Sequence, residues 1–492
     1  MHESMILMLP ILVPVMTGLL LLCMPAVKNR KVLIGITAAG LIVTAALVFF
    51  VLFQEADSFT FFYLTKSLPV YFKIDGIGRI FVTVVTIVWL SGGAFAFEYM
   101  KHETDEKRYF GFYLIVYGIL VALDFSGNII TFYLFYEMMT LLSMPLVLHT
   151  RSREAVMAGL KYMLYSFCGA YMVLYGVYFL FRFSNTLTFT AGGVLNQELI
   201  AGREQFLLFV VFLMILGFGV KAGMFPMHGW LPTAHPVAPA PASAVLSGII
   251  VKSGVLGVIR TVYYLFGADF IRGTWVQTTW IWLTLFTVFM GSMLAYREKL
   301  LKKRLAYSTV SQVSYILFGL SMLDQTAMTG SLLHVICHAF IKCTLFLCAG
   351  AIIYKTGKTR VDELAGIGKE MPALLWCYTI VSLALIGIPP TGGFVSKWYL
   401  ATGALRTKLP IVSWFGPLVL LVSALLTAGY LLPVTIQGFF PGKAFDYTHL
   451  KKKEPNLTML LPVIVLTVLA VLVGMFPSVV TDYIVNHISG LF

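Results

Sequence analysis

The fold of this chain is decided by residues Phe218–Gly254, which read FGVKAGMFPMHGWLPTAHPVAPAPASAVLSGIIVKSG. Lys221 stands inside an apolar run, prolines then interrupt that run, and a new apolar run carries a second lysine, Lys252. A lysine in hydrocarbon costs roughly 2.5–3.5 kcal/mol on insertion scales, so such residues usually serve a function. A helix broken at membrane depth is tolerated only where protein or a water-filled cavity surrounds it. The stretch therefore predicts a site inside a membrane-spanning bundle.

The composition of the whole chain is that of a polytopic membrane protein. Of its 492 residues, 59% are hydrophobic and only 12% are charged, whereas soluble domains have about 25% charged residues. The net charge of +13 comes from basic residues in short loops between apolar runs. That pattern is typical of cytoplasmic loops and not of a nucleic-acid-binding surface. We therefore expect the lipid bilayer as the surrounding medium and no nucleic acid as a partner.

Motifs that would hold a cofactor are missing from the sequence. The six cysteines lie in apolar segments without a CxxC pair, which predicts no zinc site, iron–sulfur cluster or disulfide framework. Neither a GxGxxG turn nor a P-loop occurs. We expect no metal and no cofactor in this chain, and no catalysis by this chain alone. The first apolar segment has no basic residue before it and is interpreted as a retained helix, not a cleaved signal.

Apolar runs of about 20 residues, the length that crosses a bilayer, predict an all-α polytopic membrane protein with about fourteen transmembrane helices. No large soluble domain fits between the runs, so residues 1–492 are expected to form a single membrane domain. The expected spans are residues 4–24, 32–53, 77–97, 109–123, 128–148, 161–181, 206–226, 243–266, 275–295, 306–322, 329–354, 373–403, 411–435 and 457–477.

The basic residues of the loops indicate the orientation of the spans. The ninth connection holds five of them within Arg297–Arg304, including Lys302, and the other odd-numbered connections are also basic, except the seventh. Even-numbered connections, to which Arg260 is assigned, carry far fewer. Because cytoplasmic loops are enriched in lysine and arginine, we expect the odd-numbered connections in the cytoplasm and both termini outside.

Span twelve repeats the interruption of span seven. It reads SLALIGIPPTGGFVSKW, with prolines and glycines shortly before Lys397. The expected helix breaks are Pro226 in span seven and Pro389, Pro390, Gly392 and Gly393 in span twelve. An odd offset of five spans means opposite orientation, so discontinuous helices 7 and 12 predict two inverted five-helix repeats. The expected parts are three N-terminal helices (1–108), helices 4–8 (109–266), helices 9–13 (275–435), and a cytoplasmic loop with the last helix (436–492).

Few charged residues lie deep inside the expected spans. They are four lysines and one glutamate: Lys221, Lys252, Lys342, Lys397 and Glu137. Glu137 and Lys221 are candidates to pair, because opposite charges in proximity stabilise both charged forms. His334, His338 and Lys342 follow one another at intervals of four residues, which places them on one helical face.

These residues predict a proton relay that runs from Glu137 and Lys221 through Lys252 and the histidines to Lys397, with water in the gaps. Lysine takes up and releases a proton, whereas an alkali cation needs oxygen ligands. The excess of buried lysine over buried carboxylate therefore favours protons over sodium as the ion conducted by this chain.

Each of these side chains also has a purely structural interpretation. Glu137 and Lys221 could be counter-ions that only hold helices together, and Lys342 could pair or snorkel. His334 and His338 could be hydrogen-bonded core residues. The histidines of the proline-rich break could merely bond backbone groups that the break frees; these are His228 and His235. A scaffold without ion transport is thus an alternative.

Three separated motifs in order carry a resemblance to a known family. They are KAGMFPMHGWLPTAHPVAPAPASAVLSGIIVKSGVLGVIR, LLHVICHAFIKCTLFLCAGAII and GIPPTGGFVSKW. With them the chain resembles the antiporter-like proton-channel subunits of the complex I superfamily. Such subunits occur in NADH–quinone oxidoreductase, in energy-converting membrane-bound hydrogenases and in Mrp-type sodium/proton antiporters.

The resemblance implies a fourteen-helix core with inverted repeats and no cofactor in the chain itself. It assigns the proton relay to Glu137, Lys221, Lys252, His334, His338, Lys342 and Lys397. It also implies a prokaryotic cell (inner) membrane protein that assembles with other membrane subunits, including homologous ones, and indirectly with redox subunits. A redox-driven complex of the complex I or hydrogenase type is the favoured assembly. The alternative is the D-type subunit of an Mrp-type antiporter, with sodium exchange.

Overall fold

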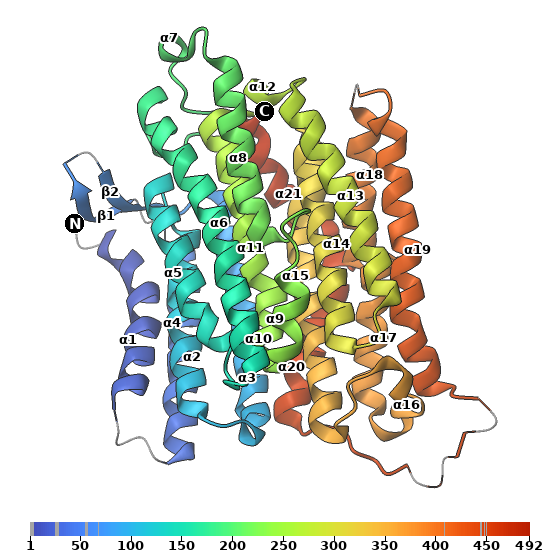
Figure 1. Ribbon diagram of the computed structural model, residues 1–492. Coiled ribbons are helices and arrows are strands. Elements are labelled where there is room, and N and C mark those ends of the chain that lie inside the picture. The colour runs from blue at the N-terminus through green and yellow to red at the C-terminus, as the bar shows by residue number, and fades with distance from the viewer. Residues whose placement is uncertain are drawn as a thin grey trace.

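The computed structural model describes residues 4–24, 29–54, 58–66, 68–407, 409–442, 445–446, 448 and 450–492. This part of the chain is a bundle of long helices that run between two ends, with one antiparallel hairpin at its side (Figure 1). Among the described residues, eleven helices are long and apolar enough to cross a membrane. The all-α polytopic fold is thereby confirmed, while the expected number of fourteen spans stays a prediction.

The N-terminal side of the bundle agrees closely with the first six expected spans. Polar side chains begin several of its helices: Asp75 Oδ1 accepts from the Gly78 amide and Asn128 Oδ1 from the Thr131 amide, which satisfies amides that a helix start leaves free. The elements are η1 (Ser4–Met8), α1 (Leu9–Cys23), α2 (Arg30–Phe53), β1 (Phe59–Thr65), β2 (Leu68–Phe72), α3 (Gly76–Tyr99), η2 (Met100–His102), α4 (Glu106–Asp124), α5 (Ile129–Val147), α6 (Arg153–Phe183) and α7 (Gln197–Ile200).

The middle of the chain forms the two most buried stretches. Residues Ala240–Phe266 are all buried, and α15 nearly so. The elements are α8 (Glu204–Ala222), α9 (Leu231–Val237), α10 (Ala240–Val245), η3 (Leu246–Ile250), α11 (Val251–Ile259), η4 (Arg260–Phe266), α12 (Ala268–Ile271), α13 (Trp275–Arg297), α14 (Leu301–Ser321) and α15 (Gln325–Thr356). Here η3 and η4 are π-helical, an irregularity that is frequent at functional sites.

The C-terminal side completes the bundle. Its elements are η5 (Val361–Glu363), α16 (Ile367–Glu370), α17 (Pro372–Ile386), α18 (Gly392–Arg406), α19 (Val412–Phe439), α20 (Leu457–Met475), α21 (Pro477–Ile488) and η6 (Ser489–Leu491). The hairpin β1–β2 and α21 have no counterpart in the expected spans, because an exposed aromatic strand pair and a short helix behind a proline lack the 20-residue apolar signal. Helix α21 packs against α3 and α15.

Both expected interruptions are present. Helix α8 ends where Gly223 takes a left-handed conformation (φ 76°), and α9 resumes at Leu231 after the break that contains Pro226. Helix α17 ends at Gly387 (φ 97°), and α18 follows. Figure 1 shows the two broken helices running in opposite directions, α8 to α9 downward and α17 to α18 upward. The opposite orientation agrees with the expectation of inverted repeats, whose exact limits stay a prediction.

The break in the second interrupted helix is placed differently from the expectation. Pro389 and Pro390 lie in it, but Gly392 and Gly393 form the first turn of α18. The physical reason is close packing: a Cβ at Gly393 would lie 1.8 Å from the Ala384 carbonyl oxygen, so the two half-helices need a glycine where they meet. The backbone conformation that ends α17 falls instead to Gly387, whose positive φ suits glycine.

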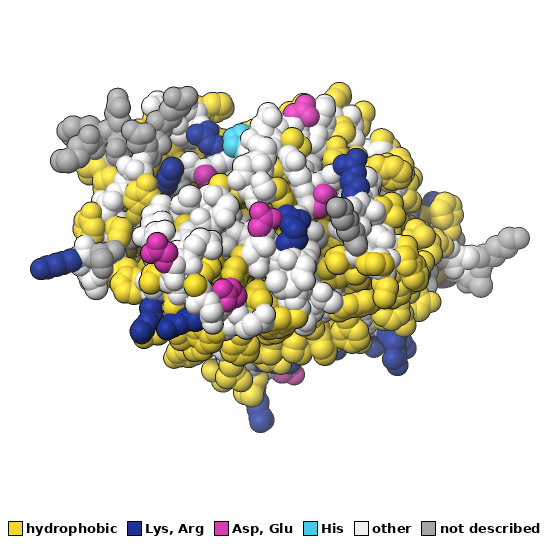
Figure 2. Space-filling view, turned by 90° about the horizontal axis from the view of Figure 1, so that it is seen from above, with side chains coloured by type: hydrophobic (Ala, Val, Ile, Leu, Met, Phe, Trp, Pro, Cys, Tyr) yellow, Lys and Arg dark blue, Asp and Glu magenta, His cyan; other side chains and the backbone are white. Residues whose placement is uncertain are grey.

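The two ends of the bundle separate the two sets of connections. The basic ninth connection and α16 lie at the lower end in Figure 1, whereas α7, α12 and the C-terminus lie at the upper end. Figure 2 looks onto the upper end and shows apolar side chains around the rim, with few charges of both signs nearer the centre. An apolar rim around a mixed polar end is the surface expected of a protein that contacts lipid on its sides. The chain is thus a multi-pass membrane protein.

Candidate functional site

Lys221 lies in the last turn of α8, not in the middle of a helix, because the break begins two residues later. Its side chain is fully buried. Its ammonium group donates to three hydroxyl groups from α5 and α6, which are Thr140 Oγ1 at 2.9 Å, Tyr162 OH at 3.0 Å and Ser166 Oγ at 3.0 Å. Since lysine has three N–H donors, the charged form is fully satisfied. A buried ammonium held by hydroxyl groups alone is a site where a proton can be stored.

The expected pair of Glu137 and Lys221 is not formed as a contact. No ion pair joins these two residues within the described part of the chain, and Glu137 Oε1 is buried there without a hydrogen-bond partner. The two groups interact electrostatically at longer range. The hydroxyl groups explain the difference, because they take all three donors of Lys221. The two candidates thus share one region of the bundle and act on each other electrostatically, without a hydrogen bond or ion pair between them among the described residues.

Lys252 lies on α11, directly behind α8. A Cβ at Gly254 would lie 3.1 Å from Lys221 Cβ and 2.5 Å from the Phe218 carbonyl oxygen, so the two lysine-bearing helices touch through this glycine. Lys252 Nζ donates to the Ser247 carbonyl oxygen at 2.8 Å and lies 2.7 Å from His338 Nδ1. Ser247 belongs to the π-helical segment η3. The structure thus brings together two residues that are 86 positions apart, as the relay requires.

His334, one turn before His338 on α15, continues the line of polar side chains toward the second broken helix. His334 Nδ1 lies 2.9 Å from Ser396 Oγ on α18, and the rings of His334 and His338 have centroids 5.8 Å apart. The next residue, Lys397, donates from Nζ to the carbonyl oxygens of Leu385 at 2.6 Å and Ile386 at 3.0 Å. Lys252, both histidines and Lys397 therefore form one connected region in the centre of the bundle.

Lys342 faces a different helix from the two histidines that precede it. Its ammonium donates to Ser308 Oγ at 2.6 Å and to the Leu305 carbonyl oxygen at 3.1 Å, both on α14. Ser308 is in turn 2.6 Å from Tyr430 OH on α19. His334, His338 and Lys342 lie along one side of α15 as expected, but the histidines and the lysine contact different helices. The reason is that residues four apart advance slightly around a helix of 3.6 residues per turn.

The histidines of the first break take separate positions. His235 is completely buried in α9, its ring stacks on Phe346 with centroids 4.6 Å apart, and neither ring nitrogen has a hydrogen-bond partner within the described residues. His228 lies in the break itself, beside Phe225. Among the described residues neither histidine bonds a freed backbone group, so the structural interpretation offered for them from the sequence finds no support in their contacts.

Two basic residues that the loop assignment placed in connections are buried. Lys302 lies in the first turn of α14, and its ammonium donates to the carbonyl oxygens of Pro236 and Ala238 at the end of α9. Arg260 starts η4, is 1% exposed and forms a bidentate pair with Asp75. We predicted neither role from the sequence, because both residues were assigned to connections, although Arg260 falls inside the expected span 243–266.

Lys302 also lines a cavity of about 320 Å³ at the end that bears the odd-numbered connections. Glu103 lines the same cavity, and burial raises the pKa of this carboxyl group while the charge of Lys302 opposes the rise. The cavity thus joins a carboxyl group and an ammonium group next to the broken helix α9.

Within the described part of the chain no three His, Cys, Asp or Glu side chains gather in a way that could hold a metal ion. The buried groups are instead amines, imidazoles and hydroxyls in hydrogen-bonding contact, which exchange protons readily. The fold and this site together define a multi-pass membrane protein with two oppositely oriented broken helices and a buried line of protonatable side chains.

Comparison with known proteins gives that class a family. The model of the NADH:quinone oxidoreductase/Mrp antiporter transmembrane family matches residues 126–436, and that of the N-terminus of complex I chain 5 matches residues 63–110. The first match spans more than half of the chain and includes every relay residue predicted from the sequence. The chain belongs to this family and is an antiporter-like membrane protein of the complex I and Mrp type.

Individual relatives come from both branches of the family. The chain is 29% identical over 426 residues to NADH-quinone oxidoreductase subunit N of Desulforudis audaxviator, covering 84% of this chain and 83% of the relative. It is 26% identical over 481 residues to the D-type subunit of the Na⁺/H⁺ antiporter of Alkalihalophilus pseudofirmus, covering 96% and 94%. A solved chain of the Mrp complex from a Dietzia species has the same fold, with a TM-score of 0.84, 20% identity and coverage of 100% and 98%.

Proposed function

We propose that this chain moves protons across a prokaryotic cell membrane through the buried line of Lys221, Lys252, His338, His334 and Lys397. The observation that carries the proposal is the 2.7 Å contact between Lys252 Nζ and His338 Nδ1 in the centre of the bundle. The state in which both of these basic groups carry a proton is unfavourable at this distance, because like charges disfavour each other. One proton shared between them is easily passed on, and the Ser396 hydroxyl near His334 leads toward Lys397.

The chain would work as one subunit of a larger membrane complex. Its partners would be other membrane subunits, including homologous antiporter-like ones, with redox subunits acting indirectly. No cofactor is proposed for this chain, because its buried groups are suited to proton transfer alone. The odd-numbered connections would face the cytoplasm and both termini the outside, since the basic residues gather at the end that holds those connections.

The test replaces Lys252 by methionine, which keeps the length and apolar stem of the side chain and removes the amine. We expect proton translocation by the intact complex in sealed vesicles, followed with a pH-sensitive dye, to fall by about a hundredfold or more. The control is Lys369→Met, which removes an exposed lysine of the short helix α16. Normal translocation per assembled Lys252→Met complex would refute the proposal and favour the scaffold interpretation.

A sodium/proton antiporter of the Mrp type is the second candidate, and the near-complete match to the D-type subunit of such an antiporter favours it. Dissipation of a pH gradient by added sodium, without any redox substrate, separates it from a redox-driven pump of the complex I or hydrogenase type. Within the spans expected from the sequence, one deep glutamate stands against four deep lysines, which supports the proton limb for this chain in either case. Labelled sodium that moves normally while Lys252→Met blocks proton movement would place the sodium path elsewhere.

A further inference from the structure

Asp124, the last residue of α4, is a buried carboxyl group that the relay does not use. It is 2% exposed, and its Oδ2 has no hydrogen-bond partner within the described residues. Close packing fixes its position, because a Cβ at Gly78 of α3 would lie 2.5 Å from the Asp124 carbonyl oxygen. Unpartnered buried carboxyl oxygens are rare in folded proteins and call for a specific explanation.

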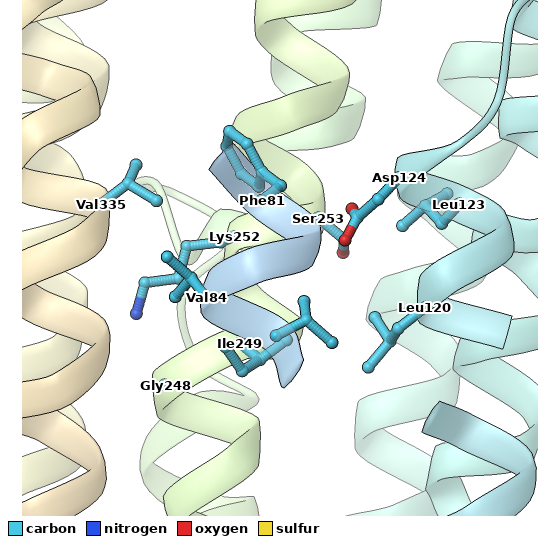
Figure 3. Close-up of a pocket in the computed structure, with 11 residues that line it drawn as sticks. Phe81, Val84, Leu120, Leu123, Asp124, Gly248, Ile249, Lys252, Ser253 and Val335 are labelled. Atoms are coloured by element: carbon cyan, nitrogen blue, oxygen red, sulfur yellow. The ribbon is translucent and has the colours of Figure 1, made fainter. Parts of the chain in front are cut away.

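The side chain of Asp124 opens into a small cavity between α3, α4 and the Lys252 segment (Figure 3). The cavity measures about 10 Å³, which is close to the space that one water molecule needs. Figure 3 shows the carboxyl group directed toward Ser253, while the ammonium group of Lys252 points to the opposite side of the same helix. Neighbouring residues of one helix thus face Asp124 on one side and His338 on the other.

Arg260 supplies the charge that acts on Asp124 from the upper end of the bundle. Its two terminal nitrogens bind Asp75, whereas its Nε is buried without a partner within the described residues. Its guanidinium lies between the rings of Phe189 and Tyr264, each 4.7 Å away, which holds it in place. One arginine therefore faces two carboxyl groups, and only Asp75 is paired with it directly.

We propose that Asp124 is a proton-carrying carboxyl group that links the Lys252 helix, through water in the cavity it lines, to the end of the bundle formed by the even-numbered connections. The inference rests on the proposed function and adds to it a carboxyl group outside the relay. Burial favours the neutral form of a carboxyl group and a nearby positive charge favours its charged form. Asp124 thus exchanges its proton with water in the cavity that it shares with Ser253 of the Lys252 helix.

The variant Asp124→Asn keeps the size and hydrogen-bonding capacity of the side chain and removes its proton. In the intact complex in sealed vesicles, we expect proton translocation to fall about tenfold or more. Asp124→Glu, which retains a carboxyl group, should recover part of that rate. The matched control is Asp269→Asn at the same end, since the Asp269 side chain is 87% exposed. Unchanged translocation in Asp124→Asn would overturn the proposal, as would a loss that only follows poorer assembly.

Infrared spectroscopy of the purified complex gives a second readout that does not depend on transport. We expect a carbonyl stretching band of a protonated carboxyl group that shifts in heavy water and is missing in Asp124→Asn but present in Asp269→Asn. An identical spectrum for the wild type and Asp124→Asn at every pH tested would overturn the proposal. If Lys252→Met leaves translocation intact, the proposed function fails, whereas the infrared band still decides whether Asp124 exchanges a proton.

Discussion

The two broken helices of this protein stabilise their lysines in different ways. Lys221 precedes its break and gives its three donors to hydroxyl groups on α5 and α6. Lys397 follows its break and gives its donors to the carbonyl oxygens of Leu385 and Ile386 at the end of α17. A helix C-terminus leaves carbonyl groups free and carries a partial negative charge, so it favours a cation directly.

This difference indicates different tasks for the two sites. Hydroxyl groups rotate and accept or donate a hydrogen bond, so the partners of Lys221 adapt to both protonation states of its amine. Backbone carbonyl oxygens only accept, so the partners of Lys397 favour the ammonium form. If the proposed relay operates, this difference predicts that the Lys221 site loads and releases a proton more readily than the Lys397 site.

The largest expected effect concerns the junction of the second broken helix. In Gly393→Ala the new Cβ would collide with the Ala384 carbonyl oxygen at 1.8 Å, so we expect a loss of about 3 kcal/mol or more in stability. The complex should then fail to accumulate, as measured by the yield of purified protein. Gly35→Ala in α2 is the control, because no atom lies within 4 Å of its added Cβ. Normal accumulation of Gly393→Ala would show that the two half-helices separate without cost.

The next effect concerns the lysines themselves. Lys221→Met removes the amine and leaves three buried hydroxyl groups without their donor, and we expect proton translocation to fall by about a hundredfold. Lys397→Met should act at least as strongly on translocation but should disturb the fold less, because Lys397 lies at a half-buried position. Thermal unfolding of both purified variants checks this order. An equal loss of stability in Lys221→Met and Lys397→Met would contradict the expectation that the hydroxyl partners of Lys221 and the carbonyl partners of Lys397 differ in their effect on the fold.

A smaller effect is expected from one hydroxyl group of the Lys221 site. Tyr162→Phe removes an acceptor of Lys221 and the 2.8 Å contact with Ser143 Oγ. An unsatisfied buried donor costs about 1–3 kcal/mol. Each ~1.4 kcal/mol, a value near the lower end of that range, corresponds to about a tenfold change in rate if that energy appears in the proton-transfer step. The control is Tyr165→Phe, one turn further along α6. A variant as active as the wild type would mean that the ring of Tyr162, whose centroid lies 4.4 Å from Lys221 Nζ, suffices.

The smallest expected effect concerns His149, which lies in the connection between α5 and α6. Burial, with a smaller contribution from Arg108, lowers the pKa of His149 from 6.5 to about 4. The neutral ring then bonds the Thr104 carbonyl oxygen at 2.8 Å. The pKa of His149 is lower in the folded protein than in the unfolded chain. The contribution of the neutral His149 ring to stability is therefore complete above about pH 6.5 and is lost as the pH falls toward 4.

Thermal unfolding of the purified protein at about pH 8 and about pH 5 measures this contribution. In the wild type the melting temperature should fall between about pH 8 and about pH 5. We expect this fall to be smaller by about 1–3 °C in His149→Asn. His487→Asn is the matched control, since His487 is an exposed histidine of α21. The same acid sensitivity in His149→Asn as in the wild type would contradict the assignment.

The sequence by itself determined the class of fold, the two broken helices and the identity of the deep lysines. Hydrophobic runs, prolines and buried charges are local signals, since their cost in hydrocarbon does not depend on which helices become neighbours. The family motifs depend on the same local residues. For this reason Lys221, Lys252 and Lys397 could be named without a structure.

Only the tertiary structure decided which groups meet. It replaced the expected Glu137–Lys221 pair by three hydroxyl groups, joined Lys252 to His338, and buried Arg260 and Asp124 near one another. Such contacts depend on the rotation and depth of helices that are far apart in the chain, and a sequence pattern fixes neither. In the sequence, a side chain at the edge of an apolar run cannot be distinguished from a loop residue. Only the positions of the neighbouring helices show that it is buried.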